Sequence, residues 1–222
     1  VKDWRARGCQ ELDPQGLIWV EQSSTAGAIV PEHEHLLWGK NEIIQPLGHL
    51  EFRLGWRSFF QSNPPAYLKL LQTLQAWIQP IPATRMLDLY CGIGSIGLFV
   101  CPSETHLVGV ESVAEAIEDA RRCSQNLGRD RAEFHVGAVE QWQDWNAEIA
   151  ILDPPRSGCH PSLLPRLKGE GPQHLFYISC NPERFLSDLE QLKGDYELMR
   201  AQAFDLFPQT AHCELLAWLR RR

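Results

Sequence analysis

The sequence predicts an α/β protein with a mostly parallel sheet and an antiparallel pair of strands at its C-terminal end. Between residues 86 and 192, apolar runs of strand length alternate with segments of helical periodicity, which is the pattern of consecutive βαβ units. The last two apolar runs, residues 196–204 and 213–219, follow one another without a helix, so they predict a hairpin at one edge of the sheet. A glycine-rich turn after the first strand of the alternation indicates a ligand site.

The composition limits the class of protein. With 222 residues, of which 44% are hydrophobic, the chain is long enough to bury a core. It contains no apolar run of membrane-spanning length and no charged-then-apolar leader, so we expect neither membrane insertion nor secretion. Seven cysteines without a CxxC spacing argue against a disulfide framework or a closed zinc site and favour a reducing cytoplasm. The formal net charge of −7 does not favour nucleic-acid binding.

Residues 1–55 are predicted to be part of a small α/β or β-rich domain, and residues 56–222 to be the main catalytic domain. The first part contains three candidate strands, at residues 16–22, 42–46 and 50–54. The second part opens with an aromatic segment and a helix that starts near Pro64 and ends before Pro80. Further strands are expected from Met86 and at residues 106–111, 132–136, 149–153 and 175–179, with helices from about Ser95 and at residues 113–127 and 182–192.

The glycine-rich turn reads GxGxxG, with Gly92, Gly94 and Gly97, and Glu111 stands at the end of the next strand. The glycines allow a sharp turn and a close approach of the backbone to a ligand. Two cofactors suit this pattern, a dinucleotide or S-adenosylmethionine. Asp88 favours the second, because a carboxylate just upstream suits a cationic amino-acid ligand better than a pyrophosphate.

Two later strands end in polar residues of chemical interest. Asp153 begins DPPRSG, whose two prolines would hold its backbone extended and aim the carboxylate into the cleft, although the prolines could simply end the strand. Cys180 lies on the turn between the fifth strand and its helix, where the helix N-terminus is predicted to stabilise a thiolate. By residue type alone, a buried structural cysteine is the more common case.

The segment FDLFPQTAHCELL adds three titratable residues, Asp205, His212 and Glu214, in apolar surroundings. Such surroundings raise the basicity of a carboxylate, as a general base requires. A methyl donor, a thiol and a carboxylate base together suit methylation of a carbon that is not nucleophilic, such as C5 of a pyrimidine. Thiolate addition at C6 activates C5, and the base later removes the C5 proton. Methylation of an amine or hydroxyl needs no cysteine.

From about residue 50 onward, the chain resembles the bacterial RNA uracil-C5 methyltransferases, most closely those that act on 23S rRNA. Five motifs carry the resemblance: RSFFQSN, LDLYCGIGSIGL, LDPPRSG, YISCNPERFLSDL and DLFPQTAHCELL. It implies the Rossmann-like sheet of class I methyltransferases, S-adenosylmethionine as cofactor, and RNA as partner, with 23S rRNA preferred over tRNA. It also implies that residues 1–50 are the tail of a central domain.

Carried over residue by residue, the resemblance implies Cys180 as nucleophile and Glu214 as base. It assigns the lining of the cofactor site to Gln61, Tyr90, Ser95, Glu111 and Asp153, and Asp153 would also face the uracil. The flipped target base would stack on an aromatic side chain, for which the candidates are Phe59, Phe60 and Phe207. The chain departs from the family pattern at Ser95, often Asn, and at Ala138, where a polar residue is expected.

Family members commonly carry an N-terminal RNA-binding β-domain and a four-cysteine iron–sulfur site. Neither is visible in this sequence, and because Cys9 is isolated we expect no cluster in the chain. Three other interpretations stay open: a methyltransferase for exocyclic amines, a dinucleotide oxidoreductase, and a non-catalytic fragment that binds the cofactor. Arg156 disfavours the first, since an aromatic residue typically follows the two prolines in amine-methylating enzymes.

Overall fold

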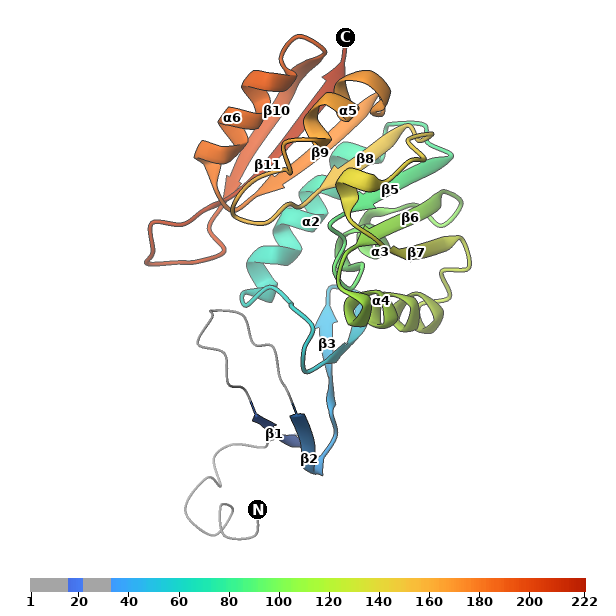
Figure 1. The fold of residues 1–222 in the computed structure, drawn as a ribbon, viewed down its shortest axis with the longest axis vertical. Coiled ribbons are helices and arrows are strands. Elements are labelled where there is room, and N and C mark those ends of the chain that lie inside the picture. The colour runs from blue at the N-terminus through green and yellow to red at the C-terminus, as the bar shows by residue number, and fades with distance from the viewer. Residues whose placement is uncertain (1–15, 22–32) are drawn as a thin grey trace.

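The computed structural model describes residues 16–21 and 33–222, and its centre is a seven-stranded sheet (Figure 1). The strand order is β10-β11-β9-β8-β5-β6-β7. The strands are β5 (Arg85–Leu89), β6 (His106–Glu111), β7 (Ala132–Val136), β8 (Ile149–Leu152), β9 (His174–Ser179), β10 (Tyr196–Phe204) and β11 (Glu214–Arg221). The five strands from β5 to β9 are parallel, and β11 is antiparallel to both β9 and β10. This confirms the predicted class I methyltransferase sheet with its antiparallel C-terminal pair.

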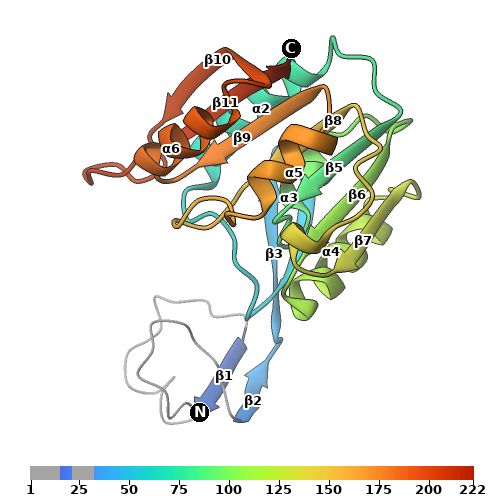
Figure 2. The same ribbon diagram turned by 45° about the horizontal axis from the view of Figure 1, so that its top comes forward.

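Helices cover both faces of the sheet because the buried strands are apolar on both sides. Met86 points into a core shared with α2 (Pro64–Ile78), α3 (Ser95–Val100) and α4 (Ala114–Asn126). Its neighbour Leu87 points into the opposite core, which includes α5 (Leu163–Glu170) and α6 (Pro182–Leu192). The two groups of helices lie on opposite sides of the sheet in Figures 1 and 2. None of the helices in the described ranges is long and apolar enough to cross a membrane.

The same local signal starts α2 and α6, the helices that flank the site described below. Each helix begins with a proline after an asparagine cap. The side chain of Asn63 accepts a hydrogen bond from the amide of Ala66 at 3.3 Å, and that of Asn181 accepts one from Arg184 at 3.3 Å. These caps account for the accuracy with which both helix starts are predicted from the sequence.

Two hairpins precede the main sheet. β1 (Gly16–Glu21) pairs with β2 (His33–Gly39), and β3 (Glu42–Leu47) pairs with β4 (Leu50–Gly55). The β1–β2 hairpin lies apart from the seven-stranded sheet in both views (Figures 1 and 2). In contrast, Phe52 and Leu54 of β4 are buried in the same core as α2. The domain boundary after residue 55 stays a prediction, and Gln22 of the first predicted strand lies outside the described residues.

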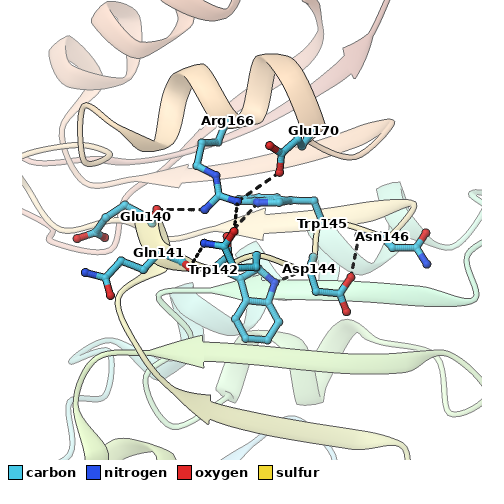
Figure 3. A network of polar contacts seen from close by, with 9 residues as sticks. Glu140, Gln141, Trp142, Asp144, Trp145, Asn146, Arg166 and Glu170 are labelled. Atoms are coloured by element: carbon cyan, nitrogen blue, oxygen red, sulfur yellow. Dashed lines mark hydrogen bonds and ion pairs between the residues drawn. The ribbon is translucent and has the colours of Figure 1, made fainter.

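Helix α5, strand β2 and the short 3-10 helix Val139–Gln141 are absent from the sequence-based expectation. Helix α5 is held by a network that Figure 3 shows around Arg166. The guanidinium of Arg166 lies 5.5 Å from the ring centroid of Trp145 and donates to the carbonyl of Glu140 at 3.2 Å. Because Pro165 and Gly169 interrupt its sequence, this helix has a weak local signal and depends on such tertiary contacts.

Candidate active site

A cavity of about 190 Å³ opens at the carboxyl ends of β5, β6 and β8. Its walls include the loop after β5, the start of α3, the end of β6, the first residue of the loop that follows β8, and the segment of residues 57–61. Eight of the residues predicted to bind cofactor or substrate line it: Phe59, Phe60, Gln61, Tyr90, Gly92, Ser95, Glu111 and Asp153. The topology therefore brings most of the predicted site together.

The loop after β5 is shaped by backbone conformations that L-residues rarely adopt. Gly92 has φ +53° and open space where a Cβ would lie, so its backbone faces the cavity. Gly94 has φ +75°, and a Cβ there would lie 2.7 Å from the ring of Phe134. Gly94 thus allows the loop to pack on β7 and does not itself line the cavity. Tyr90 adopts φ +63° although it is not a glycine, a strained conformation that persists only where the surrounding structure holds it.

Glu111 holds the same loop from the end of β6. One carboxylate oxygen accepts a hydrogen bond from the amide of Gly92 at 3.3 Å, and the other accepts one from the amide of Val113 at 2.9 Å. The oxygen bonded to Val113 also accepts from the hydroxyl of Ser112 at 2.9 Å, whereas the oxygen bonded to Gly92 keeps acceptor capacity, which suits a hydroxyl group of a nucleoside. The open backbone at Gly92, which lets a ligand come close, and the Glu111 carboxylate both fit S-adenosylmethionine.

Asp88 has a different position from the one expected of a direct cofactor ligand. It is fully buried and is absent from the cavity lining. Its Oδ2 accepts a hydrogen bond from the amide of Gly97 at 2.9 Å, while Oδ1 has no hydrogen-bond partner. Burial, together with the charge of Glu111, raises the pKa of Asp88 to about 7. The carboxyl therefore supports the glycine turn from beneath, and an attraction to a bound cation would act only through that turn.

Cys180 and Glu214 meet at the end of the β9–β11 ladder. Ser179 is paired with Leu215 in this antiparallel ladder, so the next position on each strand places Cys180 beside Glu214. Cys180 is half-buried, whereas Glu214 is only 2% exposed. Burial raises the pKa of Glu214 to about 7, against the opposing effect of the positive charge of Arg156. A carboxylate with this pKa is suited to general base catalysis near neutral pH.

The predicted stabilisation of a Cys180 thiolate by the N-terminus of α6 stays a prediction, and other groups act on this thiol in the opposite direction. Burial raises the pKa of Cys180, and the negative charges of Glu214 and Asp153 add to this effect. Arg156 acts in the opposite direction without reversing the balance. The charges of residues distant in sequence thus add to burial in opposing a thiolate at this position.

Asp153 connects the cavity with the Cys180–Glu214 pair. It lines the cavity, and its charge acts on Cys180. Its own pKa lies well above the ordinary range because of burial and, next, the charges of Glu214 and Asp88. The carboxyl group of Asp153 therefore holds its proton more tightly than an exposed aspartate does.

The three aromatic candidates differ in their surroundings. Phe59 lines the cavity and is 76% exposed. Phe60 also lines it but packs on Phe52 and Tyr67, with ring centroids 6.2 and 5.9 Å apart. Phe207 is half-buried beside His212, at 6.4 Å between centroids, and is not part of the cavity wall. Phe59 is therefore the side chain most free to stack on a substrate.

Among the residues of the site without a role assigned from the sequence, Tyr67 and Arg156 have contacts or charges that bear on the chemistry. Tyr67 lines the cavity and shares a hydrogen bond with Ser95 at 2.9 Å between their hydroxyl oxygens. Arg156 is exposed, and its charge lowers the pKa of both Cys180 and Glu214. The basic residue inside LDPPRSG was a sequence signal for a positive charge near the site. Tyr67 gave no such signal, because it looked like any other apolar position of a helix.

The loop that carries Asp153 and Arg156 is attached to α6 by another buried acid, Asp188. Oδ2 of Asp188 accepts hydrogen bonds from the amide of Cys159 at 3.0 Å and from the hydroxyl of Tyr177 at 2.7 Å. In addition, the side-chain amide of Asn181 donates to the carbonyl of Arg156 at 3.2 Å. These contacts fix the loop against the turn that holds Cys180.

Within the described residues, no group of three or more His, Cys, Asp or Glu side chains is arranged to hold a metal ion. The six cysteines of this part of the chain are unpaired. Cys9, on which the expectation about an iron–sulfur cluster depends, lies outside the described residues, so that expectation stays a prediction.

Comparison with known protein families identifies relatives of this arrangement. The model of the tRNA (uracil-5-)-methyltransferase family matches residues 119–222, and a general methyltransferase-domain model matches residues 81–153. The chain is 36% identical over 204 residues to the 23S rRNA (uracil(747)-C(5))-methyltransferase RlmC of Pectobacterium atrosepticum, covering 87% of this chain and 54% of that protein. It is 34% identical to the protein of the same name from Vibrio cholerae, covering 86% and 52%.

A solved structure supports the same relationship. The tRNA (uracil-54, C5)-methyltransferase of Pyrococcus abyssi, in complex with S-adenosyl-L-homocysteine, superposes with a TM-score of 0.81 at 32% identity. The match covers 94% of this chain and 51% of that one. The chain likewise spans about half the length of the curated relatives it matches.

Proposed function

The chain belongs to the RNA uracil-C5 methyltransferase family, and from that premise we propose that it methylates C5 of a uridine in RNA. The observation that carries the proposal is the adjacency of Cys180 and Glu214 across β9 and β11. Neither residue lines the cavity, but Asp153 does, and its charge acts on Cys180 while the charge of Glu214 acts on it. The 23S rRNA is the preferred substrate and tRNA the second, following the names of the relatives. The cytoplasm is the proposed location.

The residues of the cavity define how S-adenosylmethionine would be held. Glu111, the open backbone at Gly92, and the side chains of Gln61, Tyr90 and Ser95 would bind it. When bound, S-adenosylmethionine supplies an electrophilic methyl group. Asp153 would orient the uracil at the junction between this cavity and the thiol, with Phe59 as the stacking surface.

The two catalytic residues act at adjacent carbons of the uracil ring. The Cys180 thiolate forms a bond with C6, and the electrons of the C5–C6 double bond become available at C5. After C5 carries the methyl group, the Glu214 carboxylate removes the C5 proton. The electrons of that C–H bond restore the double bond, and the sulfur leaves C6 as a thiolate. Arg156 would favour the thiolate in the first step through its positive charge.

An RNA that contains 5-fluorouridine tests this sequence of steps. Because fluorine at C5 cannot be removed as a proton, the protein should stay covalently attached to the RNA after methyl transfer. We expect a slow-migrating adduct on a denaturing gel that requires both Cys180 and S-adenosylmethionine. Methylation of ordinary RNA that survives Cys180→Ser would contradict the mechanism and favour an amine-methylating enzyme.

The identity of the substrate requires a separate experiment. Purified protein should be incubated with unmodified 23S rRNA and unmodified tRNA, and 5-methyluridine should then be mapped in each by mass spectrometry. We expect the modification in 23S rRNA at a single nucleotide. Modification of tRNA alone would reverse the preference, and cofactor binding without modification of either RNA would identify a non-catalytic fragment.

A further inference from the structure

One wall of the cofactor cavity, residues 57–61, belongs to no helix or strand. It follows β4 through a turn in which the amide of Ser58 donates to the carbonyl of Gly55 at 3.0 Å. Gln61 and the exposed Phe59 both lie in this wall. A loop of this kind forms a stable binding surface only if contacts from elsewhere hold it, since ordering it on binding would weaken affinity.

Phe60 anchors one end of the wall by packing on Phe52 and Tyr67. The polar contacts that hold the other end, the turn at Gly55–Ser58, converge on Asp119 of α4, which is 2% exposed. Its Oδ2 accepts hydrogen bonds from the amide of Gly55 at 2.9 Å and from the hydroxyl of Ser58. Its Oδ1 pairs with the guanidinium of Arg122. The approach is close, because a Cβ added to Gly55 would lie 3.1 Å from Oδ2. A buried carboxylate with these donors makes strong, directional hydrogen bonds.

Helix α4 is also attached to the opposite wall of the cavity. The amide of Val113, directly before the helix, donates to Glu111 at 2.9 Å, and Glu111 in turn accepts from Gly92. Asp119 therefore links the wall that contains Gln61 to the unit that contains Glu111. A further connection between this wall and α4, from Arg57 to Glu115 at 3.2 Å, is an exposed ion pair, which contributes little.

We propose that Asp119 is a positioning residue for cofactor binding, which fixes the Gly55–Ser58 turn and thereby the distance between Gln61 and Glu111. This inference rests on the proposed function only in taking S-adenosylmethionine as the ligand of the cavity. It assigns Asp119 no contact with the cofactor.

The test is the affinity of the purified 222-residue chain for S-adenosylmethionine and S-adenosylhomocysteine, measured by isothermal titration calorimetry. Asp119→Asn, which keeps the size of the side chain, should raise the Kd roughly tenfold, the equivalent of one charge-assisted hydrogen bond. Ser58→Ala should raise it about threefold. In a Gln61→Ala background the effect of Asp119→Asn should shrink, because both changes act on the same wall. At saturating cofactor, kcat should stay within about twofold of the wild type, with the effect confined to KM.

Glu148→Gln provides a matched control. Glu148 also accepts three hydrogen bonds, from the amides of Thr84 and Arg85 and from the Thr84 hydroxyl, but at the opposite end of β5. This variant should lower the free energy of unfolding without changing the Kd. If Asp119→Asn loses stability but binds cofactor like the wild type, or if Glu148→Gln weakens binding as much, the proposal is overturned.

The binding measurement also separates this proposal from the proposed function. If wild-type protein binds S-adenosylmethionine but modifies no RNA, the proposed function fails while the Kd comparison still decides the role of Asp119. If the RNA is methylated and Asp119→Asn leaves both the Kd and the KM for the cofactor unchanged, only the positioning role fails.

Discussion

The cofactor side and the nucleophile side of the candidate site are assembled in different ways. On the cofactor side, the loop at Tyr90–Ser95 and Glu111 come from two consecutive βα units, and much of the binding surface is backbone. On the nucleophile side, Asp153, Cys180 and Glu214 come from three separate segments and meet only through the β8–β9–β11 part of the sheet. The first side depends on local turn geometry, whereas the second depends on strand register and on charges that act between distant residues.

The largest effect that separates the two sides is expected from Cys180→Ser. If the two sides act separately, the variant should lose methylation by about a thousandfold or more, because a serine hydroxyl is a poor nucleophile toward C6. Its Kd for S-adenosylmethionine should stay within about twofold. The matched control is Cys213→Ser, another half-buried free cysteine, which should keep its activity. A joint loss of cofactor binding and activity in Cys180→Ser would show that the two sides are not separable.

The cofactor side can be divided in turn by its two glycines. Gly94→Ala combines a left-handed backbone with a Cβ 2.7 Å from Phe134, so we expect it to lower the free energy of unfolding by about 2–4 kcal/mol. Gly92→Ala adds a Cβ to open space, and we expect a loss of only about 1 kcal/mol. Urea unfolding measures both.

Binding should show the reverse order for the two glycine variants. Gly92→Ala projects a methyl group toward the cavity. It should raise the Kd for the cofactor even though nearly all of the protein stays folded. Gly94 does not line the cavity, so Gly94→Ala should reduce cofactor binding only in proportion to the fraction of protein that is unfolded. Equal effects of the two variants on stability would contradict the packing of Gly94 on β7.

The nucleophile side should have a measurable cost in stability. The pKa of Glu214 is about 7 in the folded protein, above its ordinary value of 4.5, so the folded state holds the proton more tightly than the unfolded state. The stabilisation from this group is complete below about pH 4.5 and is lost as the pH rises through 7. Glu214→Gln should therefore be more stable than the wild type at pH 8 by about 1–3 kcal/mol and show no such gain at pH 4.5. Thermal unfolding at the two pH values measures the difference.

The cofactor side was easier to predict from the sequence than the nucleophile side. The glycine turn, Glu111 and the starts of α2 and α6 were predicted because their signals lie within a few residues of one another. Cys180 and Glu214 were singled out as a candidate thiol and base from their surroundings in the sequence, and the resemblance implied their roles. Their adjacency could not be predicted, because it depends on the register between β9 and β11, which no local pattern specifies. For the same reason the effect of Glu214 and Asp153 on the pKa of Cys180 could not be predicted. The role of Asp119 was equally hidden, because its partners Gly55 and Ser58 are more than sixty positions away.

The smallest expected effect concerns Arg156, the exposed residue whose charge acts on both catalytic groups. Its positive charge lowers the pKa of Cys180 and of Glu214, so its removal should raise both. Arg156→Gln should shift the pH–rate profile of methylation to higher pH by about half a unit, with activity reduced a few-fold at pH 7 and largely restored at pH 9. Arg156→Lys, which keeps the charge, should leave the profile in place. If the activity of Arg156→Gln is reduced equally at every pH, the residue acts by contact with the RNA, and its charge does not tune the nucleophile side. If the Kd for S-adenosylmethionine changes as well, the boundary between the two sides lies closer to the cofactor than the structure indicates.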